Sequence, residues 1–250
     1  MIYLVKLMIL ISNLCGHKYY IIWINYMNKI CCIFINHTPD LYKDVFDRMS
    51  KSVDYIDFYN YNPDWVKIRE MFGDVMFTQR TEGANPTWGN AAFALYYFKS
   101  MHPDYDYYFL CENDVYFTGD YKVLFDRLTE NIYNFDAIIE KPFYRTWNWP
   151  WIVDEKDYRL LDGYNNKNYY NCLYTFCCFS NKMIDHIVQR YRDGYYGHYE
   201  LVISCILHKY GGKYDYVEDH VVFKNYVGES SITESDFKIE NALLHPVKQR

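Results

Sequence analysis

Residues 105–120 read YDYYFLCENDVYFTGD. The apolar part of this run has the composition of a buried strand, and we expect the strand to extend from Tyr105 to Phe117. Two carboxylates, Glu112 and Asp114, lie two residues apart and therefore on one face of an extended chain. Because ligands of open α/β sheets bind beyond the carboxyl ends of the strands, the run predicts a buried strand and a site at its end.

The two carboxylates need compensation if they are buried side by side. A divalent cation would offset their repulsion, and hard oxygen ligands suit Mg²⁺ or Mn²⁺. We therefore predict that Glu112 and Asp114 are metal ligands. The same residues also fit a solvated strand end whose acidic groups cap the next helix, and the spacing alone leaves both interpretations open.

Strand-like and helix-like patterns alternate on both sides of this run, without internal repeats or a linker. This alternation predicts one α/β domain with a central, mostly parallel sheet flanked by helices. The expected strands lie at residues 30–36, 55–61, 75–78, 105–117, 137–140, 172–179 and 214–217. The expected helices lie at residues 41–49, 64–71, 87–100, 120–129, 182–191 and 199–209.

The composition excludes several classes of protein. The chain has 250 residues, half of them hydrophobic, and a formal net charge of −6, which argues against disorder and against a nucleic-acid binder. Aromatic residues make up 21% of the chain; they can stack on sugars, or they can reflect a compositional bias. The eight cysteines include no Cys-x-x-Cys pair, and most lie in apolar runs. This pattern predicts buried thiols and a reducing, cytoplasmic location.

Residues 1–27 differ from the rest of the chain. They contain two apolar runs, Leu7–Leu14 and Tyr19–Tyr26, each too short to span a bilayer. No small-residue cleavage site follows, so a secretory signal is disfavoured. We expect this segment to be an extension outside the folded domain, which would occupy residues 28–250. Weak membrane association through residues 1–26 stays open.

The run from Asp106 to Asp120 resembles the acidic-motif strand of GT-A-fold glycosyltransferases, in particular those with a Glu-x-Asp-Val-x-Phe-Thr-Gly motif. The likeness is best over Thr87–Leu128 and implies a single GT-A-like, Rossmann-like domain. In that superfamily the motif holds Mn²⁺ or Mg²⁺ against the diphosphate of a nucleotide sugar. By this resemblance Asp114 binds the metal, and Glu112 binds the metal or the donor ribose.

Three residues outside the motif are candidates for further roles. A late histidine completes the metal site in several transferases of this kind, so the resemblance implies that His245 is a third ligand; it also fits a surface position in a tail. Glu200 begins an apolar helix, where an acid can deprotonate an acceptor hydroxyl or favour the helix dipole. Asp219 follows a late strand and is a second candidate base, or a turn residue.

Six residues lie where the resemblance places the donor nucleotide: Asn36, His37, Thr38, Arg80, Trp88 and Asn90. Each of them also fits ordinary capping or packing. Three alternating tryptophans, Trp147, Trp149 and Trp151, lie in a long segment that we expect to act as a lid, either stacking on a sugar or burying the site.

Together with these residues, the resemblance implies a glycosyltransferase that moves a sugar from a nucleotide-sugar donor, with a UDP-sugar favoured, to a glycan or another hydroxyl acceptor. The cofactor would be Mn²⁺ or Mg²⁺, and no nucleic-acid partner is expected. One alternative is a carbohydrate-binding protein that keeps the fold without the chemistry. A metal-dependent phosphohydrolase is a third hypothesis, but it would need more acidic or histidine ligands close together in the sequence than this chain has.

Overall fold

The computed structural model describes residues 5–12, 19–26, 28–36, 42–72, 91–141, 143–144, 170–195, 199–209, 211–225 and 232–247. Its centre is a six-stranded sheet of order β11-β7-β10-β5-β3-β4. The strands are β3 (Ile30–Ile35), β4 (Ile56–Tyr61), β5 (Tyr107–Glu112), β7 (Ala137–Ile139), β10 (Phe176–Ser180) and β11 (Tyr214–Tyr216). β10 is antiparallel to both β5 and β7, and the other pairings are parallel.

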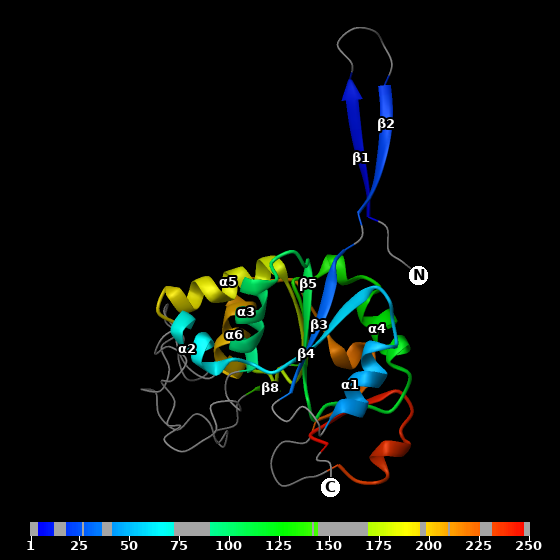
Figure 1. Ribbon diagram of the computed structural model, residues 1–250, viewed down its shortest axis with the longest axis vertical. Coiled ribbons are helices and arrows are strands. Elements are labelled where there is room, and N and C mark those ends of the chain that lie inside the picture. The colour runs from blue at the N-terminus through cyan, green and yellow to red at the C-terminus, as the bar shows by residue number, and fades with distance from the viewer. Residues whose placement is uncertain are drawn as a thin grey trace.

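Helices cover both faces of this sheet (Figure 1). α2 (Trp65–Phe72), α3 (Ala91–Met101), α5 (Asn181–Arg192) and α6 (Tyr199–Lys209) lie on one side, and α1 (Lys43–Ser50) and α4 (Tyr121–Thr129) lie on the other. The structure therefore confirms the predicted α/β class with a mostly parallel central sheet flanked by helices.

The central strands are buried on both faces. Cys31 and Ile33 pack in the core under α3, α5 and α6, while Cys32 and Phe34 pack in the core under α1 and α4. All of β3 is buried, which explains why its sequence is apolar without alternation. The cysteines follow the same rule, because all seven described ones are buried. Burial also raises the pKa of the Cys111 thiol well above its usual range, which makes it unreactive.

The predicted strand from Tyr105 to Phe117 is wrong in one important respect. β5 ends at Glu112, and the next residues form a turn that the Val115 N–H closes by donating to the Glu112 carbonyl at 3.1 Å. Asn and Asp favour such turns because their side chains compete for backbone hydrogen bonds. The chain then enters β6 (Tyr116–Phe117), which belongs to a different sheet.

This second sheet has the order β12-β13-β6, with β12 at Val222–Asn225 and β13 at Ala242–His245. β13 is parallel to β12 and antiparallel to β6. The Thr118 hydroxyl, just after β6, joins the middle of the chain to its C-terminal segment, since it donates to the Ile239 carbonyl at 2.6 Å and accepts from the Ala242 N–H at 2.8 Å. The last strand is thereby fastened beside the turn that follows β5.

The remaining described elements are short or peripheral. The two-residue strands β8 (Phe143–Tyr144) and β9 (Tyr170–Asn171) pair with each other. Three short 3-10 helices are η2 (Ile132–Asn134), η4 (Val217–Asp219) and η5 (Asp236–Lys238). Side-chain caps start two helices: Asp120 accepts from the Lys122 N–H before α4, and Ser180 accepts from the Met183 N–H before α5.

The N-terminal apolar runs form an antiparallel hairpin of β1 (Val5–Ser12) and β2 (Tyr19–Tyr26). Figure 1 shows the hairpin projecting away from the layers of helix and sheet. None of the described helices is long and apolar enough to cross a membrane. The domain start at residue 28 and membrane association through residues 1–26 stay predictions.

We predict that Thr118→Val lowers the free energy of unfolding by about 1–2 kcal/mol, because it leaves the Ile239 carbonyl and the Ala242 N–H without the hydroxyl. Thr118→Ser keeps the hydroxyl and is the matched control, which we expect to stay closer to the wild type. Urea unfolding monitored by circular dichroism measures both variants. Equal stability of the Val variant and the wild type would show that the hydroxyl does not fasten β13.

Candidate metal centre

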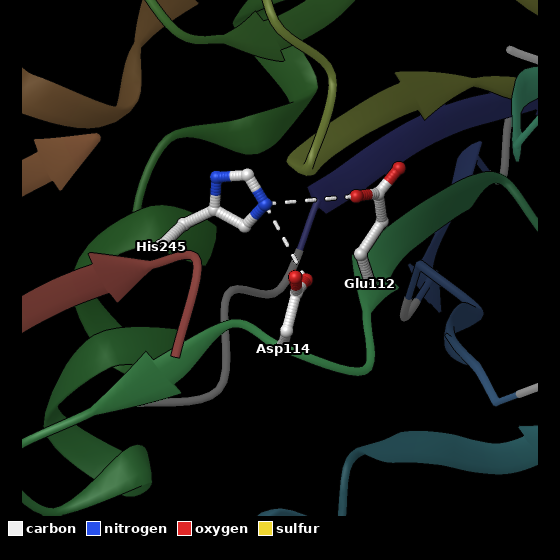
Figure 2. A group of neighbouring side chains, drawn as sticks. All are labelled: Glu112, Asp114 and His245. Carbon is white, nitrogen blue, oxygen red and sulfur yellow. Dashed lines mark ion pairs between the residues drawn. The ribbon is translucent and has the colours of Figure 1, made fainter. Parts of the chain in front are cut away.

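Glu112, Asp114 and His245 converge at the carboxyl end of β5 (Figure 2). The His245 Nε2 atom lies 3.3 Å from Asp114 Oδ1 and 3.8 Å from Glu112 Oε2. One possible ligand atom from each residue lies within 4.8 Å of the others. The structure thus brings together the three residues that the sequence predicted as metal ligands, although His245 lies far along the chain from the other two.

Each of the three side chains is held by main-chain structure. Glu112 is the last residue of β5, and Asp114 lies in the turn that follows. His245 ends β13, whose pairing with β6 places it opposite this turn. The Val247 N–H then donates to the Asp114 carbonyl at 2.8 Å, which ties the chain on the far side of His245 to the same turn.

The predicted reason for the pairing of the carboxylates needs correction. Glu112 and Asp114 do not share the face of one continuous strand, because β5 ends at Glu112. They approach His245 from a strand end and from a turn, as Figure 2 shows. A turn can bring both side chains to one point, where a straight strand would have separated them along its length.

The electrostatics of the site favour a cation. Burial raises the pKa of the Glu112 carboxyl from 4.5 to about 7; the His245 imidazole opposes this shift, and the Asp114 carboxylate adds to it. The Glu112 and Asp114 side chains are each 24% exposed, so solvent reaches the group without surrounding it. Two carboxylates and one imidazole are a donor set that fits Mn²⁺ or Mg²⁺. The positive charge of such an ion would offset the negative charges of the two carboxylates.

The candidate nucleotide residues are only partly described. Asn36 is fully buried just beyond β3, and its N–H donates to the Tyr61 carbonyl at 2.9 Å. The preceding residue, Ile35, pairs with Glu112, so Asn36 lies at the same edge of the sheet as the three-residue group. The other candidates lie outside the described residues: His37, Thr38, Arg80, Trp88 and Asn90. Trp147, Trp149 and Trp151 lie outside them too.

The two candidate bases have different surroundings. Glu200 lies in the first turn of α6 and is 6% exposed. Asp219 lies in η4 and forms an ion pair with Lys141, whose Nζ is 2.6 Å from Asp219 Oδ1. Neither belongs to the three-residue group, and their catalytic roles stay predictions.

Sequence reasoning missed a further buried acid, Glu140. This residue follows β7 and is 5% exposed, and its Oε1 accepts a hydrogen bond from the Thr175 hydroxyl at 2.8 Å. A signal was present, because Glu140 ends an apolar strand just as Glu112 does. Since β7 and β5 run in the same direction on either side of β10, their acidic ends lie at the same edge of the sheet.

No protein-family model matches the sequence, and no curated protein matches it. Among solved structures, the chain is similar to 4-diphosphocytidyl-2C-methyl-D-erythritol synthase from Anaerococcus prevotii DSM 20548, with a TM-score of 0.42 and 14% sequence identity. The match covers 86% of this chain and 97% of that chain. A likeness this loose carries no argument about activity.

We predict a pH-dependent effect of Glu112→Gln on the stability of the metal-free protein. The folded protein keeps a proton on Glu112 between pH 4.5 and about 7, whereas the unfolded chain releases it, so this group lowers stability as pH rises through that window. Glutamine does not ionise, so the variant does not lose stability in this way as the pH rises. In EDTA, we expect the variant to match the wild type near pH 5 and to exceed its stability at pH 8 by at most about 3 kcal/mol.

Thermal melts at both pH values measure this difference. Glu70→Gln, at an exposed position on α2, is the matched control and should show the same small difference at both pH values. A Glu112→Gln effect that does not change with pH would contradict the burial of the carboxylate.

Proposed function

We propose that this protein is a metal-dependent glycosyltransferase that takes its sugar from a nucleotide-sugar donor. The observation that carries the proposal is the convergence of Glu112, Asp114 and His245 at the carboxyl end of a central strand. That edge is where open α/β sheets bind their ligands. The motif around Glu112 also resembles the acidic motif of GT-A-fold glycosyltransferases, which supports the same assignment.

In this proposal Glu112, Asp114 and His245 hold Mn²⁺ or Mg²⁺, whose chemistry is to neutralise the charge that develops on the nucleoside diphosphate as it leaves. Asn36 lies at the same sheet edge, one residue beyond the partner of Glu112, and would contact the donor nucleotide. His37, Thr38, Arg80, Trp88 and Asn90 are proposed for the same role from their sequence positions. A UDP-sugar is the proposed donor.

Glu200 is the better of the two candidate bases. Glu200 lies in the first turn of α6, and its charge, like that of Glu112, adds to the rise that burial causes in the pKa of the Tyr199 hydroxyl. Asp219 is instead ion-paired with Lys141, so one of its carboxylate oxygens already holds an ammonium group. We therefore propose that Glu200 accepts the proton of the acceptor hydroxyl, with Asp219 as the second choice. The acceptor itself would be a glycan or another hydroxyl compound.

We predict that Asp114→Ala abolishes metal-dependent donor binding and leaves the fold intact. The side chain faces His245 rather than the core, and the main-chain bond from Val247 to the Asp114 carbonyl does not need it. Calorimetry with UDP-, GDP- and CMP-sugars, each with and without Mn²⁺, should show one nucleotide that binds the wild type only with metal. In the variant we expect that affinity to fall by at least about 100-fold.

Asp104→Ala is the matched control, because Asp104 is an exposed acid just before β5, at the end opposite the site. It should bind the donor as the wild type does. Metal-independent binding of glycans, unchanged in Asp114→Ala, would instead support a carbohydrate-binding protein without the chemistry. Absence of any nucleotide-sugar binding would contradict the proposal.

A further inference from the structure

Glu140 is a buried acid to which the proposed reaction assigns no role. It lies one residue beyond β7 and is 5% exposed. β10 separates β7 from β5, so two strand spacings lie between Glu140 and Glu112 along the sheet edge. A buried carboxylate is costly unless it is hydrogen-bonded, and the Thr175 hydroxyl donates to Glu140 Oε1 at 2.8 Å.

Thr175 connects Glu140 to the candidate metal centre. It is 3% exposed and directly precedes β10. While its hydroxyl donates to Glu140, its carbonyl accepts the Glu112 N–H at 2.8 Å. The main chain on the Glu140 side is held as well, since the Cys172 thiol donates to the Glu140 carbonyl at 3.0 Å.

The bond between Thr175 and Glu112 extends the sheet beyond its regular end. The last pair of the β10–β5 ladder is Phe176 with Cys111, and Thr175 with Glu112 is the next contact along the two chains. This hydrogen bond therefore fixes the backbone of Glu112, the residue at which β5 ends and the turn begins. A small rotation of the backbone there would swing the Glu112 carboxylate away from Asp114 and His245.

We propose that Glu140 is a positioning residue of the metal centre: by holding the Thr175 hydroxyl it fixes the Thr175 carbonyl, which in turn fixes the Glu112 backbone and the place of its carboxylate. This inference rests on the proposed metal centre. Residues that hold a metal ligand in place commonly affect metal affinity, with losses of about 10–100-fold when they are removed. Thr175 contacts the Glu112 backbone directly, and Glu140 acts through Thr175.

The test measures Mn²⁺ affinity by the loss of the free-ion signal in electron paramagnetic resonance, with no nucleotide present. Thr175→Val and Glu140→Ala each break the link, and we expect each to weaken Mn²⁺ binding by about tenfold or more. Thr175→Ser keeps the hydroxyl, and Glu140→Gln keeps an oxygen that can accept its hydrogen bond. Both conservative variants should stay within about threefold of the wild type if the hydrogen bond, and not the charge, positions Glu112.

Thr129→Val is the matched control for a purely structural loss. Thr129 is 7% exposed, and its hydroxyl donates to the Phe125 carbonyl within α4 at 2.7 Å. We expect this variant to melt at a lower temperature and to bind Mn²⁺ with wild-type affinity.

Wild-type affinity in Thr175→Val and Glu140→Ala would overturn the inference while leaving the metal centre in place. Equal losses in Glu140→Gln and Glu140→Ala would overturn it too, because charge would then account for the effect. A wild-type protein that does not bind Mn²⁺ would instead contradict the proposed function. If Thr175→Val fails to fold, the comparison of Thr175→Ser with Glu140→Gln and Glu140→Ala decides the matter.

Discussion

The antiparallel pairing of β13 with β6 is the interaction on which the candidate site depends. It brings the last strand of the chain against the turn that follows β5, and Thr118 and Val247 fasten that strand on both sides of His245. Without this small second sheet, Glu112 and Asp114 would lack the imidazole of His245 beside them. With it, an imidazole lies within 3.3 Å of Asp114, and the group acquires the donor set of a metal site.

The main sheet supplies the electrostatic setting. Its parallel strands direct their carboxyl ends to one edge. Glu112 is the last residue of β5, Glu140 directly follows β7, and Glu200 lies in the first turn of the buried helix α6. Farther along the edge, Lys141 compensates Asp219 through its ammonium group and Glu218 through its backbone N–H. Among the described residues, no such lysine lies beside Glu112 and Asp114. The pKa of the Glu112 carboxyl is raised because burial disfavours its charged form, and a bound cation would stabilise that form.

Much of the fold could be predicted from the sequence, because local patterns determine it. The apolar run at 30–36 is β3, and the helices expected at 120–129 and 199–209 are α4 and α6 within one residue. The same local patterns predicted a single strand over Tyr105–Phe117, because aromatic and β-branched residues continue after Glu112 and Asp114. The break at Glu112 depends on β6 pairing with β13, a contact between distant parts of the chain that periodicity does not reveal.

Glu140 was missed for a similar reason, since its significance depends on its hydrogen bond with Thr175, which directly precedes β10. The site residues that fall outside the described part of the chain stay predictions.

The measurement that tests the central claim most directly is anomalous X-ray diffraction from crystals of the protein soaked in Mn²⁺ with UDP. We predict a manganese peak within bonding distance of the Glu112 and Asp114 carboxylates and of His245 Nε2, with the diphosphate of UDP on its open side. A peak elsewhere in the molecule, or none at this position in a crystal that diffracts well, would contradict the account.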